Sequence, residues 1–76
     1  MLYLVKFRAQ SDAQDLNFRV ARTLFAECNT QPSREKVLQL LNRITGGDFL
    51  EDTIEIRELR DFDPIEVRGR ATVFSL

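Results

Sequence analysis

The chain has 76 residues, 43% of them hydrophobic and 30% charged, and its formal net charge is −1. This length predicts one domain over residues 1–76, and the composition is that of an ordinary soluble globular protein. The sequence argues against a membrane-spanning helix, because no apolar run approaches the roughly 18 residues needed, and the apolar stretch at the N-terminus is too short for a signal peptide.

The first predicted elements are a strand and a long helix. Residues 2–8, "LYLVKFR", alternate as a strand does, with Val5 and two aromatic residues on one face. Ser11 and Gln14 fit a capping box, and the apolar residues after them recur at helical spacing. We therefore expect an amphipathic helix over residues 12–28.

A second helix is predicted to begin near Pro32, since proline suits the first turn of a helix. It should end at Gly46, where a left-handed C-cap belongs, with Arg43 in the last turn near the negative end of the helix dipole. The apolar stripe between these points consists of Val37, Leu38, Leu40, Leu41 and Ile44.

Two more strands are predicted over residues 53–59 and 65–74, joined by the turn sequence "RDFDP". An antiparallel hairpin with Ile56 opposite Val67 puts the apolar residues of both strands on one face. This register also sets opposite charges across the ladder on the other face, Glu55 with Arg68 and Arg57 with Glu66.

Phe62 is the unexplained residue of this turn. Its neighbours Asp61 and Asp63 can bond nearby backbone amides, and Pro64 stiffens the chain after them. Two interpretations stay open: the ring closes the end of the core, or it is exposed and held ready for a partner.

The predicted order of elements is β-α-α-β-β. We expect an α+β fold of two layers, in which a three-stranded sheet carries both helices on one face. The other face of the sheet is then open.

Catalytic chemistry is poorly represented in this sequence. The chain has no histidine, the commonest general base and metal ligand. Cys28 is the single cysteine and falls on the apolar side of the predicted first helix, so we interpret it as core packing. We expect no enzymatic activity, no metal and no cofactor. A lone cysteine also fits a reducing compartment, and we expect the protein to be cytoplasmic.

One pair of segments is similar to RNA-recognition motifs: "RGRATVF" (68–74) resembles the RNP1 strand and "LYLVKF" (2–7) resembles RNP2. Arg70 and Thr72 stand where RNP1 has its stacking aromatic residues, and the predicted order of elements differs from β-α-β-β-α-β. We therefore assign the chain to no family.

Our leading hypothesis is a small protein-binding or regulatory module without catalytic activity, such as an inhibitor or accessory protein of the kind found in mobile genetic elements. It would act through the open sheet face or the loop surface, with another protein or a second copy of the chain as partner. The candidate contact residues are Leu2, Leu4, Phe62 and Phe74. In a variant of this hypothesis, the acidic segment 48–66, with a charge balance of −6, attracts a basic partner.

The alternative hypothesis is nucleic-acid binding. If the first and last strands are neighbours, four cations form a basic stripe on the open face: Lys6, Arg8, Arg68 and Arg70. Phosphate contacts need little more than such a stripe.

Overall fold

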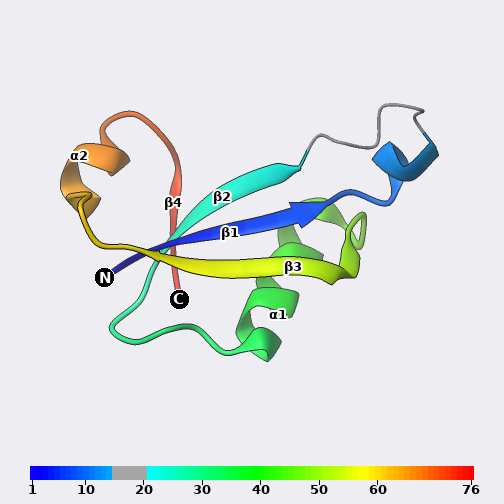
Figure 1. Cartoon of the computed structure of the whole chain (residues 1–76), viewed down its shortest axis with the longest axis horizontal. Helices are drawn as coiled ribbons and strands as arrows, with labels where there is room; N and C mark the ends of the chain where they lie inside the picture. The colour runs from blue at the N-terminus through cyan, green and yellow to red at the C-terminus, as the bar shows by residue number, and fades with distance from the viewer. Residues whose placement is uncertain (15–20) are drawn as a thin grey trace.

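The computed structural model describes residues 1–14 and 21–76. In chain order its elements are β1 (Leu2–Arg8), the 3-10 helix η1 (Ser11–Gln14), β2 (Arg22–Glu27), α1 (Arg34–Thr45), β3 (Leu50–Leu59), α2 (Pro64–Arg68) and β4 (Val73–Ser75). In this described part, four strands form one mixed sheet in the order β3-β1-β2-β4 (Figure 1). The predicted α+β class is confirmed, whereas a three-stranded sheet is wrong.

β1 is a central strand of the sheet. It pairs antiparallel with both β2 and β3, so that Val5 lies opposite Leu24 on one side and Ile56 on the other. The predicted strand over residues 2–8 is confirmed, and its alternation places Tyr3, Val5 and Phe7 in the core. β4 pairs with the outer side of β2 and runs parallel to it.

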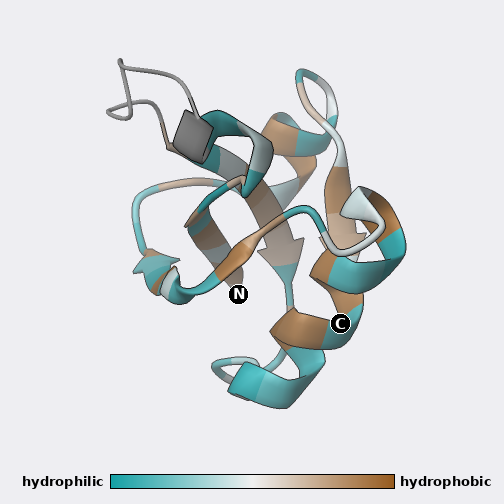
Figure 2. Cartoon of the chain, turned by 90° about the vertical axis from the view of Figure 1, so that its right-hand side faces the viewer, coloured by the Kyte–Doolittle hydropathy of each residue, from teal (hydrophilic) through white to brown (hydrophobic). Residues whose placement is uncertain are grey.

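α1 covers one face of this sheet. Ser33 is its N-cap and accepts a hydrogen bond from the Lys36 N–H at 3.2 Å, while Gly46 ends it in the left-handed conformation with φ of 66°. The predicted C-cap is therefore confirmed. The buried side of α1 packs against residues of β1 and β2 and consists of Val37, Leu40 and Leu41. Hydropathy accordingly alternates along this helix (Figure 2). No helix in the described ranges is long and apolar enough to cross a membrane.

The predicted helix over residues 12–28 is wrong in the part that the structure describes. Residues 22–27 form β2, and residues 15–20 lie outside the described residues. The N–H and the hydroxyl group of Ser11 both donate to the carboxylate of Asp48, at 2.8 and 2.7 Å. The Gln14 side chain of the predicted capping box lies outside the described residues.

The predicted hairpin is also wrong. Ile56 pairs with Val5 of β1, and Val67 belongs to α2. The expected cross-strand pairs of opposite charge are therefore absent: Glu55 lies opposite Lys6, and Arg57 lies opposite Leu4. The physical reason is that Asp63 and Pro64 start a helix, with Asp63 as N-cap and the proline in the first turn, where its missing N–H costs nothing.

The expectation of both helices on one face is wrong as well. Ala26 points into the core on the α1 side, so the next residue of the strand, Glu27, points to the other face of the sheet. Leu2, which lies opposite Glu27 in β1, is on this second face too. Arg68 of α2 binds Glu27, and residues of α2 line a hollow together with Phe25, so α2 contacts this second face. Figure 1 shows α2 beside one end of the sheet. Leu2 is only 1% exposed because this end of the face is covered.

We predict that the Ser11–Asp48 contact makes the stability of the fold depend on pH in the acidic range. The hydrogen bonds from Ser11 hold the pKa of Asp48 below its ordinary value of 3.8. A depressed folded-state pKa gives a stabilisation that is present above 3.8 and lost as pH falls through the lowered pKa. Thermal unfolding of wild type and Asp48→Asn, from neutral pH downward, should converge in acid. If the two curves stay parallel, Asp48 does not carry this dependence.

We also predict that Tyr3 loses its proton at a higher pH in the folded protein than in the unfolded chain. Tyr3 is the single tyrosine in a chain without tryptophan. Burial first, and then the nearby Glu58 and Cys28, raise its pKa above 10.0. Tyr3 therefore stabilises the fold below the unfolded-state pKa of about 10, and this contribution is lost as pH rises through the folded-state pKa. The ultraviolet absorbance of the phenolate should appear at higher pH in native protein than in denaturant. Coincident curves would show that Tyr3 is solvated.

Candidate functional site

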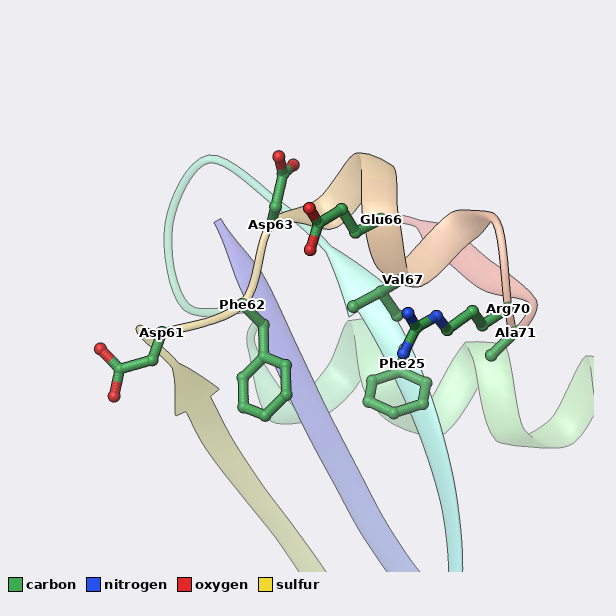
Figure 3. A pocket seen from close by; sticks show the side chains of 8 residues that line it. All are labelled: Phe25, Asp61, Phe62, Asp63, Glu66, Val67, Arg70 and Ala71. Carbon is green, nitrogen blue, oxygen red and sulfur yellow. The ribbon is translucent and has the colours of Figure 1, made fainter.

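The face of the sheet that α1 leaves free has a hollow beneath α2, with a volume of about 220 Å³. Figure 3 shows it from close by, with α1 passing behind the strands. Its apolar lining comes from β2, from the turn after β3, and from α2 and the segment after it: Phe25, Phe62, Val67 and Ala71. Segments distant in sequence therefore build one surface.

Phe25 is placed in the hollow by the alternation of β2. Leu24 and Ala26 are buried in the core on the α1 side, so the residue between them points to the opposite face. Phe25 lies opposite Leu4 of β1 and Val73 of β4, and it is half-buried. Its ring is fixed by a strand with neighbours on both sides.

Phe62 comes from the turn between β3 and α2, and its side chain is 56% exposed. The turn is tied locally, because the carboxylate of Asp63 accepts a hydrogen bond from the Ile65 N–H at 2.9 Å, and Pro64 restricts the backbone at the start of α2. The interpretation of Phe62 as a plug that closes the core is therefore wrong. The backbone that carries Phe62 is restrained, and more than half of the residue is exposed to water.

The Arg68 side chain connects α2 to the sheet. The Arg68 guanidinium donates to Glu27 Oε2 at 2.6 Å and to Ser75 Oγ at 3.1 Å, so it bridges β2 and β4. The pair is solvated, with the Arg68 side chain 43% exposed, and such pairs contribute about 1 kcal/mol or less. Its role is to orient α2 over the hollow.

The rim of the hollow is acidic. It carries three carboxylates and one guanidinium group: Asp61, Asp63, Glu66 and Arg70. None of the described salt bridges involves these four groups. Figure 3 shows Asp61 and Asp63 pointing outward from the rings, while Arg70 points toward the hollow. Carboxylates near an exposed aromatic ring suit an apolar group that carries positive charge.

The predicted contact residues do not form one surface. Leu4 and Phe62 lie on the face that carries the hollow, and Leu4 is half-buried beside Phe25. Leu2 shares this face but is buried beneath the covered end, so it is not available to a partner. Phe74 packs on the opposite side, against the core under α1.

The predicted basic stripe is not formed. Arg68 and Arg70 lie in α2 and the segment after it, and β4 is not adjacent to β1. Lys6 and Arg8 lie in the later part of β1 and line a separate hollow of about 320 Å³, which they share with Glu55. Arg68 is engaged by Glu27. The four cations therefore fall into two groups, and each group has an acidic neighbour.

The described residues contain no group of three Asp, Glu or Cys side chains able to hold a metal ion. Cys28 is half-buried just after β2 and does not belong to the buried core, contrary to its interpretation as core packing. Its backbone N–H donates to the Met1 carbonyl at 3.0 Å.

Phe25 is the site residue that sequence reasoning missed. It falls within the helix predicted over residues 12–28, which the helical spacing of the apolar residues favoured. A competing signal was present in "RTLFAE", where Leu24 and Ala26 alternate with Thr23, Phe25 and Glu27. Alternation with a β-branched and an aromatic residue on one face is typical of a strand.

Comparisons with protein-family models, with curated proteins and with solved structures each gave no match. The functional argument therefore rests on the geometry of this site.

Proposed function

We propose that the chain is a small protein-binding module without catalytic activity, and that the hollow lined by Phe25 and Phe62 is its binding site. The observation that carries this proposal is the exposed Phe62 ring, held by a short tied turn next to a second aromatic ring. Pre-organised aromatic side chains are the residues on which protein interfaces most often depend. A regulatory, inhibitory or accessory role in the cytoplasm is consistent with such a module.

We infer the chemistry of the partner from the charges on the rim. Three carboxylates against one guanidinium group give the rim a net negative charge, and the surrounding segment 48–66 adds to it. We propose a partner segment that inserts a large apolar side chain between the rings and carries lysine or arginine next to it. Burial of an apolar side chain supplies about 1.5–3 kcal/mol, and the carboxylates favour the adjacent cation.

Nucleic acid is not our proposed partner. The alternative required four cations in one stripe, and these residues lie in two separate places. The exposed Phe62 ring that could stack on a base lies between Asp61 and Asp63 along the chain, and carboxylates repel phosphates.

We predict that Phe62→Ala weakens binding but preserves the fold. A phage-displayed peptide library selected on the wild-type protein should yield peptides with an aromatic or large aliphatic residue beside lysine or arginine. Truncation of the Phe62 ring should weaken binding of such a synthetic peptide by about 2 kcal/mol, or about thirtyfold, as measured by fluorescence anisotropy. The cost in stability should be about 1 kcal/mol or less, because the ring is 56% exposed.

Ile65→Ala is the matched control, since Ile65 is a more exposed apolar residue, at 79%, in the adjacent first turn of α2 and does not line the hollow. It should bind the peptide normally. Glu66→Gln should weaken binding and reduce its salt dependence, because it removes a rim charge. The proposal fails if the library yields no such consensus, or if Phe62→Ala and Ile65→Ala bind alike.

A further inference from the structure

The outer edge of β3 is an unpaired strand edge. In the described part of the chain β3 pairs only with β1, so its other side presents backbone N–H and C=O groups without a neighbouring strand. The opposite edge of the sheet is the three-residue β4, whereas β3 has ten residues. A long open edge is a template for pairing with another strand.

The first half of this edge is occupied. Arg34 of α1 donates to the Glu51 carbonyl at 2.8 Å. The pairing with β1 is also irregular here, since the register shifts between Lys6 and Arg8. Where the strand pairing is interrupted, the Thr53 hydroxyl group accepts a hydrogen bond from the Arg8 N–H at 3.0 Å and donates one to the Leu50 carbonyl at 2.6 Å. Such irregularity discourages pairing with another chain.

The second half has no such protection. Residues 55–59 pair with β1 in unbroken register, and no described side chain bonds to their outward backbone groups. Ile54 and Ile56 point to the α1 side and pack against the core, yet both stay half-buried because the sheet ends at β3. This half of the edge therefore has both open backbone and apolar surface to bury.

The charges on the other face favour a second copy of this chain as the occupant. In an antiparallel pair related by a two-fold axis, one residue faces its own copy. If Ile56 is that residue, Glu55 lies opposite Arg57 of the second copy, and Arg57 opposite its Glu55. A shift of the centre by one residue either way sets Glu55 against Glu55 or Arg57 against Arg57. Opposite charges across a ladder stabilise it and like charges destabilise it.

We propose that the chain forms a homodimer in which two copies of β3 pair antiparallel with Ile56 at the two-fold axis, joining both sheets into one. This surface is separate from the hollow beneath α2, so the proposal does not depend on the proposed function. The pairing buries the exposed parts of both Ile56 side chains against each other and forms two pairs of opposite charge.

A cysteine cross-link tests the dimer and its register together. In a Cys28→Ser background, Ile56→Cys places the two new thiols directly opposite, with Cα atoms about 4.5–5.5 Å apart, which a disulfide can bridge. Ile54→Cys is the matched control: it changes the same residue type, on the same face and with similar burial, but its two copies lie about 13 Å apart in this register. Mild oxidation should link Ile56→Cys into a covalent dimer and leave Ile54→Cys largely monomeric.

Sedimentation equilibrium of the wild type should give twice the mass of the chain. Arg57→Glu should weaken dimerisation by about tenfold, since it sets two pairs of carboxylates opposite each other. Arg57→Glu should not create a charge conflict within one chain, because the uncharged Leu4 lies opposite residue 57 in β1. A monomeric wild type, or equal cross-linking at positions 54 and 56, overturns the proposal.

Discussion

The parallel pairing of β4 with β2 is the constraint on which the rest of the structure depends. β3 and β4 lie at opposite edges of the sheet, so the chain between Leu59 and Val73 must cross from one edge to the other. α1 already covers one face, and the crossing runs over the other. It carries Phe62 to the side of Phe25, and so the crossover that completes the sheet also builds the hollow.

Much of the framework could be predicted from local patterns. α1 was predicted because its caps, its last-turn arginine and its apolar stripe all indicate the same element, although Ile44 at the end of the stripe is 40% exposed. The strand character of β1 and the inward direction of Ile54 and Ile56 follow from alternation, which holds whichever strand is the neighbour. Phe62 was identified as a candidate contact residue because nothing in the structure of a turn requires an aromatic ring.

The pairing of the strands could not be predicted in the same way. The residues before Cys28 fit both a helical and a strand periodicity. The local sequence does not decide between them, and pairing with the neighbouring strands β1 and β4 stabilises the strand. In "DPIEVRG" the alternation of Ile65 and Val67 predicts a strand, whereas Asp63 and Pro64 predict the start of a helix. The structure has the helix, with Asp63 as its N-cap. The partner of β4 lies about 48 residues away along the chain, so no local signal specifies it.

The central claim is tested most directly by nuclear Overhauser effects between backbone protons in solution. The account predicts contacts between the strands of residues 25–27 and 73–75, in the register that sets Phe25 beside Val73 and Ala26 beside Phe74. Helical contacts should connect residues 63–68. Cross-strand contacts between Ile56 and Val67 instead would mean that the chain folds back as a hairpin, that nothing crosses the second face, and that the hollow does not exist.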